Sequence, residues 1–167
     1  MQSTVNFVRG SYARAVNILN SLQSPLLLAI RLYWGYQFMQ DGWGKLTHLD
    51  RVTQFFSSLN LPAPGMTALA VGLIELLGGA LFTFGIASRL VSLVLFLNMT
   101  MAYLSVPDDR VNFSHILSKP EDFYGATPYV YWFAALMILI LGPGYFSIDA
   151  FLERLFGPKK KLGPRAI

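Results

Sequence analysis

The stretch MTALAVGLIELLGGALFTFGIASRLVSLVLFLNMTMAYLSV, residues 66–106, decides the fold of this chain. It contains two apolar segments, residues 66–85 and 87–106. Each is close to the roughly 20 residues with which an α-helix crosses the hydrocarbon core of a bilayer. Because the two segments are joined by only a few residues around Gly85 and Arg89, the pattern predicts an antiparallel pair of membrane-spanning helices.

Two further apolar segments flank this pair, one from Pro25 to Leu46 and one from Pro128 to Leu141. The whole chain is 54% hydrophobic and 13% charged, whereas a soluble domain is about 25% charged. We therefore predict an all-α fold, an integral membrane four-helix bundle with short interfacial amphipathic helices. The predicted parts are an N-terminal cytoplasmic or interfacial helix over residues 1–24, the transmembrane domain over residues 25–156 and a basic cytoplasmic tail over residues 157–167.

Outside the predicted spans, two segments have apolar residues on one helical face, which is typical of helices that lie on a membrane. One comprises Val8, Tyr12, Ala15, Leu19 and Leu22, and the other comprises Val52, Phe55, Phe56 and Leu59 behind a predicted Asp50 cap. Residues 107–127 are predicted to form an external loop that ends in an aromatic belt and serves as a docking surface for a partner.

Composition also excludes several classes of function. The chain has no cysteine and only two histidines, so it has no disulfide, dithiol chemistry or Cys-ligated metal, and we expect no metal site. The pI is near 9.5, but the basic residues cluster at the C-terminus beside apolar segments. We therefore expect contact with anionic lipid headgroups and not with nucleic acid. No Ser/His/Asp spacing, nucleophile elbow or phosphate-binding glycine loop is present, so no self-contained catalytic constellation is predicted.

The distribution of basic residues predicts the orientation in the membrane, because cytoplasmic segments are enriched in Lys and Arg. The chain ends and the turn between the second and third spans hold Arg9, Arg14, Arg89, Arg154, Lys159, Lys160, Lys161 and Arg165. The opposite side holds Lys45, Arg51, Arg110 and Lys119. We therefore expect both termini to be cytoplasmic.

Polar residues inside the predicted spans are the candidate functional groups. On the first span Arg31, Gly35, Phe38, Gly42 and Lys45 form one stripe, and on the second span Gly72, Glu75 and Gly79 form another. Charges inside a bilayer are costly unless they face a partner or water, so the two stripes should pack together. Aligning the predicted helix ends brings Arg31 within reach of Glu75, and we predict an ion pair between them that is either structural or functional.

Near the outer end of the first span, Gln37, Asp41 and Lys45 lie beside Trp43. They are interpreted either as a polar mouth for a quinone or flavin-like headgroup, or as a solvated helix end with an interfacial salt bridge. Asn98 on the third span is interpreted as an interhelical hydrogen bond or a ligand contact. The candidate ligand-binding residues are thus Arg31, Gln37, Asp41, Lys45, Glu75 and Asn98.

The chain resembles the DoxX family of small bacterial four-helix membrane proteins. The resemblance rests on Arg31, Gly35, Phe38, Gly42, Lys45 and Leu46, on Glu75, Gly78, Gly79, Leu81, Gly85 and Arg89, and on Gly142, Pro143, Gly144, Ser147 and Asp149. It implies a helical bundle in the bacterial inner membrane and an association with membrane oxidoreductase systems, including quinone-linked sulfur oxidation.

Three hypotheses about function follow. In the first, the chain is a quinone-interacting or accessory component of a membrane-associated oxidoreductase system, with a soluble or membrane oxidoreductase as partner. No cofactor is intrinsic to the chain in this hypothesis, and a quinone is the expected ligand. In the second, it is a structural or assembly subunit that binds no ligand. In the third, it is a pathway for a small solute or proton in which Glu75 changes protonation, and this requires a homo-oligomer because four helices are few for a transporter.

Overall fold

The computed structural model describes residues 2–156, with side chains from residue 9 onward, and the described chain is all-helical. The elements are α1 (Gln2–Thr47), α2 (Leu49–Ser58), α3 (Pro64–Phe84), α4 (Ser88–Ser105), α5 (Pro107–Ser114), α6 (Pro120–Gly125), α7 (Pro128–Leu141) and α8 (Ile148–Phe156). The expected basic tail at residues 157–167 lies outside the described residues.

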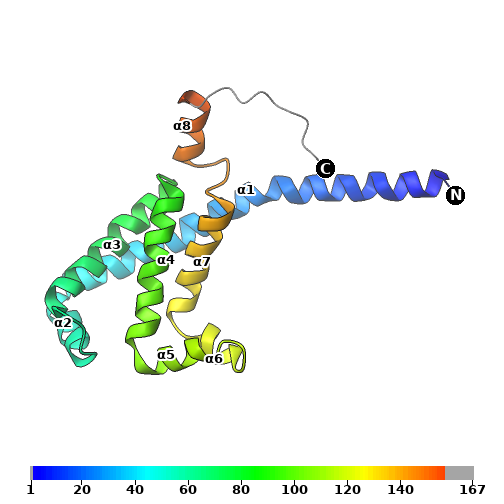
Figure 1. Ribbon diagram of the computed structural model, residues 1–167. Helices are drawn as coiled ribbons and strands as arrows, with labels where there is room; N and C mark the ends of the chain where they lie inside the picture. Colours follow the sequence, from blue (N-terminus) through cyan, green and yellow to red (C-terminus); the bar gives the residue numbers. More distant parts are fainter. Residues whose placement is uncertain (1, 157–167) are drawn as a thin grey trace.

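The helices are arranged as two pairs that cross each other (Figure 1). The most extensive contacts are those of α1 with α3, followed by those of α4 with α7. Helices α3 and α4 are joined at Gly85, which ends α3 in the left-handed region with φ of 69° and allows the Ile86 N–H to bond to the Leu81 carbonyl at 3.0 Å. This tight turn makes α3 and α4 the predicted antiparallel hairpin.

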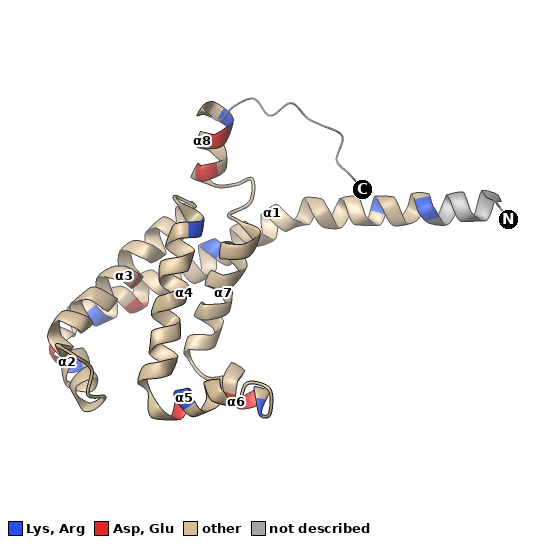
Figure 2. Ribbon diagram, in the orientation of Figure 1, with Lys and Arg blue, Asp and Glu red and all other residues tan. Residues whose placement is uncertain are grey.

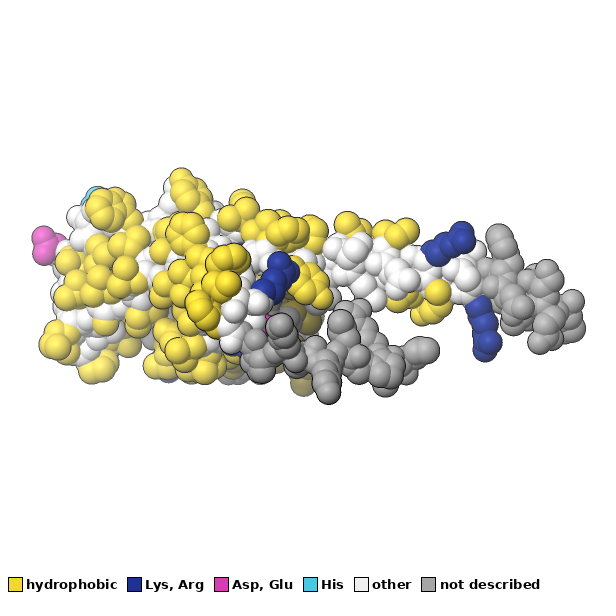
Figure 3. All heavy atoms as spheres, turned by 90° about the horizontal axis from the view of Figure 1, so that it is seen from above, with side chains coloured by type: hydrophobic (Ala, Val, Ile, Leu, Met, Phe, Trp, Pro, Cys, Tyr) yellow, Lys and Arg dark blue, Asp and Glu magenta, His cyan; other side chains and the backbone are white. Residues whose placement is uncertain are grey.

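The surface of these helices has the character of a membrane protein. Helices α3 and α4 are long and apolar enough to cross a membrane by length and composition, and α7 is a shorter apolar helix. Large apolar side chains remain exposed along them, including Leu73, Leu77 and Leu97. Figure 3 shows hydrophobic side chains over most of the visible face of the helical body. The predicted all-α membrane bundle is confirmed, while the crossing of the membrane by four helices stays a prediction.

The N-terminal segment differs from the prediction. We expected a separate helix before Pro25, but α1 continues through Pro25 as one helix of 46 residues. Its first half extends away from the rest of the molecule (Figure 1). Proline lacks the N–H that would bond to the Ser21 carbonyl, but this removes one hydrogen bond from a long helix and does not require the helix to end. The first residue of the apolar segment, Pro25, is therefore not the first residue of a helix.

The shorter segments show three further differences. The predicted helix after the first span is confirmed as α2, but His48 and not Asp50 is its N-cap residue, and no side chain caps it. Residues 107–127, predicted as a loop, contain α5 and α6. They are held to α4 by the buried Tyr103, whose hydroxyl donates to the Phe123 carbonyl at 2.9 Å. Helix α8 follows the Gly142–Gly144 turn and was not predicted.

Glycines set the contact between α1 and α3. A Cβ atom at Gly79 would lie 2.8 Å from the Gly35 carbonyl oxygen and 2.8 Å from the Met39 backbone nitrogen, and one at Gly42 would lie 2.7 Å from the Gly72 carbonyl oxygen. Such contacts are possible only where a residue has no side chain. The predicted contact between the two small-residue stripes is therefore confirmed.

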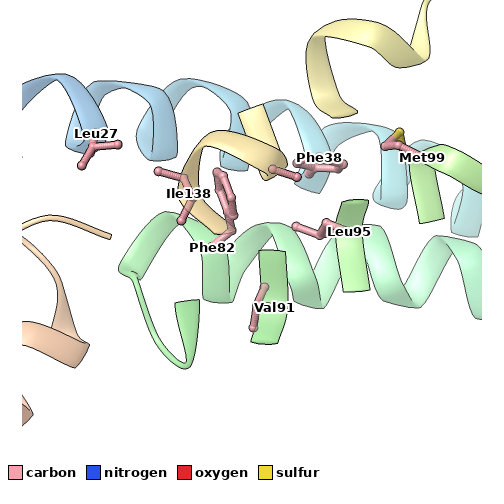
Figure 4. Close-up of a cluster of buried hydrophobic side chains, with 8 residues drawn as sticks. Leu27, Phe38, Phe82, Val91, Leu95, Met99 and Ile138 are labelled. Carbon is pink, nitrogen blue, oxygen red and sulfur yellow. The ribbon is translucent and has the colours of Figure 1, made fainter. Parts of the chain in front are cut away.

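The apolar core lies where the two helix pairs cross (Figure 4). Phe38 of α1, Phe82 of α3 and Leu95 of α4 are all fully buried there. Phe38 and Phe82 make an edge contact with ring centroids 6.2 Å apart. The cluster is completed by Leu27, Val91, Met99, Ala135 and Ile138.

Candidate functional site

A cavity of about 420 Å³ lies between α1, α2, α3, α4 and α7, toward the end of the molecule formed by α2 and α5. We name it the head cavity. Its volume lies within the roughly 300–1,000 Å³ range of small-molecule sites. The lining is largely apolar and comes from Phe55, Phe56, Leu59, Leu61, Pro62, Val71, Met99, Met101, Ala102, Val106, Pro128 and Tyr131, with the polar residues Asp41, Lys45, Thr67, Glu75, Asn98, Ser105 and Thr127.

Lys45, Glu75 and Asn98 form one connected polar cluster in the head cavity. The Lys45 ammonium makes an ion pair and hydrogen bond with Glu75 Oε2, and the Asn98 side-chain amide donates to Glu75 Oε1 at 3.2 Å. Both carboxylate oxygens are therefore bound by side chains from two other helices. Glu75 is only 2% exposed, so this bonding compensates for the cost of burying its charge.

The predicted ion pair between Arg31 and Glu75 was wrong, and the helix register explains why. The glycine contacts place Glu75 level with Gly42 of α1, where a Cβ atom would lie 2.9 Å from the Glu75 carbonyl carbon. Arg31 lies eleven residues before that level, about 16–17 Å along the axis, whereas Lys45 lies three residues after it, about 4–5 Å. Side chains also lean toward the N-terminus of their helix, so Lys45 leans toward Glu75 and Arg31 leans away from it.

Arg31 instead belongs to a second polar cluster near the start of α8. Its guanidinium is fully buried, packs against Gly85 and donates a hydrogen bond to the Phe146 carbonyl. Nearby, the Asp149 carboxylate accepts hydrogen bonds from the Ala87 N–H at 2.8 Å, the Ser88 N–H at 2.7 Å and the Ser88 hydroxyl at 2.6 Å. Asp149 thereby caps the N-terminus of α4 from a distant part of the chain.

The structure thus divides the predicted site residues between two places. Asp41, Lys45, Glu75 and Asn98 line the head cavity together, whereas Arg31 and Gln37 do not line it. Asn98 makes a hydrogen bond between α4 and α3, which agrees with its interpretation as an interhelical contact. It also lines the cavity.

Tyr131, Phe55 and Phe56 line the head cavity but were not among the predicted site residues. Each lay in a segment with a clear pattern, the aromatic belt for Tyr131 and the amphipathic helix for the two phenylalanines. No spacing along the chain indicated that these segments fold over the first span.

The apolar core separates the two polar clusters. On α1 the order is Arg31, Phe38 and Lys45, and on α3 Phe82 lies between Glu75 and the turn at Gly85. Figure 2 accordingly shows few charged residues along the ribbons of α3, α4 and α7. Within the described part of the chain, no group of three or more His, Cys, Asp and Glu residues could hold a metal ion.

The fold and these two polar clusters define an all-helical membrane protein with charged groups in its interior. Residues 26–108, about half of the chain, match the family model DoxX, and this range includes Arg31, Lys45, Glu75 and Asn98. The chain belongs to the DoxX family.

The chain is also similar to a Bacillus subtilis (strain 168) protein named "Putative oxidoreductase CatD". The two are 26% identical over 125 residues, which cover 75% of this chain and 85% of that protein. No solved structure matches the chain.

Proposed function

We propose that the head cavity binds the ring of a quinone and that the protein is an accessory component of a membrane-associated oxidoreductase system. The observation that carries this proposal is the distribution of polarity in the cavity. Aromatic and aliphatic walls from α2, α4 and α7 surround one end where Lys45, Glu75 and Asn98 meet. A quinone has the same division, with an apolar ring and carbonyl oxygens that accept hydrogen bonds.

The cluster has hydrogen-bond donors beyond those used within the protein. The Lys45 ammonium carries three N–H groups and the Asn98 amide carries two, and each group uses one in bonding to Glu75. Two ammonium donors and one amide donor therefore remain for carbonyl oxygens of a ligand. Tyr131 also lines the cavity, and its side chain carries a further polar group, the hydroxyl.

Within this proposal, the protein residues bind and orient, and the quinone supplies the redox chemistry when bound. Glu75 holds Lys45 in place, and the aromatic rings of α2 cover the ring of the ligand. Electrons come from an oxidoreductase partner, soluble or membrane-bound. The name of the Bacillus subtilis relative supports a link to oxidoreductases.

The proposal places the chain in the bacterial inner membrane as a multi-pass protein with both termini cytoplasmic. The support is the excess of Lys and Arg on the side of the chain ends and of the α3–α4 turn. In this orientation the head cavity lies in the outer half of the molecule. The apolar core between the two polar clusters argues against a proton route through a single copy.

Binding of menadione, a quinone ring without a long chain, tests the proposal. The protein is reconstituted in lipid nanodiscs and titrated with menadione, and an organic extract is examined by mass spectrometry for a co-purifying quinone. We expect the wild-type protein to bind menadione and Lys45→Met to weaken binding by about tenfold, which corresponds to 1.4 kcal/mol.

Lys119→Met, the same change between α5 and α6, is the matched control and should bind like the wild type. A folded wild-type protein that binds no menadione, or a Lys45→Met variant that binds as tightly as the control, would contradict the proposal.

A further inference from the structure

The projecting half of α1 carries an apolar stripe that no other part of the described chain covers. Tyr12, Leu19, Leu22 and Leu26 are 72%, 66%, 54% and 56% exposed, and Ala15 is also exposed. These five residues follow one another at steps of three, four, three and four, which is the spacing of the a and d positions in a heptad repeat. A stripe with this spacing is typical of a helix that packs lengthwise against another helix.

The stripe continues along the half of α1 that contacts α3. Ala29, Tyr33 and Tyr36 occupy the next a and d positions and are exposed as well, the two tyrosines by 60% and 56%. Eight consecutive a and d positions, or four heptads, are therefore open to a partner, and we name these eight residues the α1 seam. The bundle packs on another side of α1, where Leu27 and Arg31 are buried. A second helix can thus lie along the seam without displacing α3 or α7.

The residues around the seam favour a second copy of this chain as its partner. Between residues 10 and 30 the one charged residue is Arg14, at position c of the heptad and away from the seam. The flanking e and g positions in this range include Val16, Ile18 and Gln23, so they hold no charge that would select a different partner. Two copies in one membrane also share one orientation, which brings their seams together in parallel and in register.

The direction of α1 argues against the membrane surface as the partner. Its second half runs along α3, which is long and apolar enough to cross a bilayer. Because α1 does not end at Pro25, its first half continues away from the helical body (Figure 1). A helix that runs straight on from a membrane-embedded half leaves the bilayer and does not lie on its surface. Outside the bilayer, a second helix removes Leu19 and Leu22 from water.

We propose that two copies of this protein pair in parallel through the α1 seam, as a coiled coil that begins outside the membrane and continues into the bilayer. The interface is isologous, because each copy presents the same seam to the other. Leu19 and Leu22 of one copy then insert between side chains of the second copy, and Ala15 and Ala29 allow the two helices to approach closely. This inference goes beyond the proposed quinone site and does not depend on it.

Disulfide cross-linking of the full chain in isolated membranes tests the pairing, because the chain has no cysteine of its own. Leu19→Cys and Leu22→Cys each place a single thiol in the seam. Asn17→Cys and Asn20→Cys are the matched controls, at exposed positions on the opposite face of the same two turns. With copper phenanthroline as the oxidant, we expect the seam variants to give at least about fivefold more disulfide-linked dimer, since a disulfide needs Cα atoms within about 7 Å.

Paired aspartates test the seam by a second route. Leu19→Asp combined with Leu22→Asp places like charges within the interface, whereas Asn17→Asp combined with Asn20→Asp adds the same charge to the opposite face. Energy transfer between fluorescently labelled copies in lipid vesicles measures the dissociation constant of the pair. We expect the seam variant to weaken pairing by at least about tenfold and the control by less than about twofold. Both sets of changes lie in the projecting half, outside the helical body.

Three results would overturn the inference. The first is equal cross-linking at the seam and control positions, which indicates random collision. The second is a seam that lies on the membrane surface, in which case Leu19→Cys and Leu22→Cys form no dimer and react more slowly with a water-soluble maleimide than the two controls. The third is a seam that binds a different protein, in which case purified copies show no energy transfer in vesicles.

Discussion

Lys45 on α1 and Glu75 on α3, 30 residues apart in the chain, form an ion pair at the polar end of the head cavity. The lysine side chain is 28% exposed and the glutamate side chain 3%, so the pair joins a partly exposed lysine to a buried glutamate. The pair fixes both the register of α1 on α3 and the position of the ammonium group that faces the cavity.

The pairing predicts a specific energetic coupling. Lys45→Met leaves a buried carboxylate without its cation and should lower the free energy of unfolding by about 3 kcal/mol. In the double variant with Lys45→Met and Glu75→Gln, the loss of unfolding free energy should be smaller than the sum of the two single losses by at least about 1 kcal/mol. Arg31→Met and Glu75→Gln should be additive within about 0.5 kcal/mol. Unfolding in detergent gives these values, and a coupling of Glu75 to Arg31 instead of Lys45 would refute the assignment.

The glycine contact between α1 and α3 predicts a second result. Gly79→Ala places a methyl group 2.8 Å from backbone atoms of α1, so it should destabilise the protein by about 1–3 kcal/mol. Gly44→Ala on α1 meets no atom within 4 Å and should be neutral or stabilising by up to about 1 kcal/mol, because alanine favours the helix. Equal melting temperatures for the two variants would show that the helices do not approach at Gly79.

Asp149 predicts a dependence of stability on pH. Burial alone would raise the pKa of its carboxyl group, but hydrogen bonds from Ser88 and Ala87 and the charge of Arg31 outweigh burial and hold the pKa below its ordinary value. A carboxylate whose pKa is lowered by folding stabilises the protein above its unfolded pKa of about 3.9. That contribution is lost as pH falls toward the folded pKa.

Asp149→Ala should therefore lower stability by about 1–2 kcal/mol at neutral pH, the usual cost of losing a helix cap. The difference from the wild type should shrink as the pH is lowered below about 4. Glu153 is an exposed carboxylate on the same helix, so Glu153→Gln is the control. It should change neither the stability at neutral pH nor the dependence of stability on pH. Thermal unfolding over a pH series measures both, and a difference that is constant with pH would contradict the prediction.

The continuity of α1 through Pro25 predicts a distance. The chain has no cysteine, so spin labels can be attached at Ser11→Cys and Gln40→Cys without altering other residues. One continuous helix separates these positions by about 43 Å at 1.5 Å per residue, whereas two helices at a right angle would give about 31 Å. Pulsed electron paramagnetic resonance distinguishes the two, and the shorter distance would show that the helix ends near Pro25.

Hydrophobic patterning was sufficient to predict the apolar hairpin. The segments 66–85 and 87–106 correspond to Pro64–Phe84 and Ser88–Ser105 within about two residues, because the limits of an apolar run and the position of Gly85 are local properties. The contact between the glycine stripes of α1 and α3 was predicted for a similar reason. Small residues at helical spacing indicate which faces approach each other.

Charge pairing and the cavity walls could not be predicted in the same way. The partner of Glu75 depends on a shift of a few residues between α1 and α3 and on the direction in which side chains lean, and neither is visible in helix ends estimated from hydropathy. Likewise, Phe55, Phe56 and Tyr131 lie in segments whose folding over the first span depends on tertiary contacts.

The uninterrupted α1 also has a consequence for the head cavity. Its projecting N-terminal half is joined without a loop to the half that contacts α3, and the glycine contact lies between the projecting half and Lys45. A protein or membrane surface that binds the projecting half is thus connected through one helix to the position of the Lys45 ammonium group.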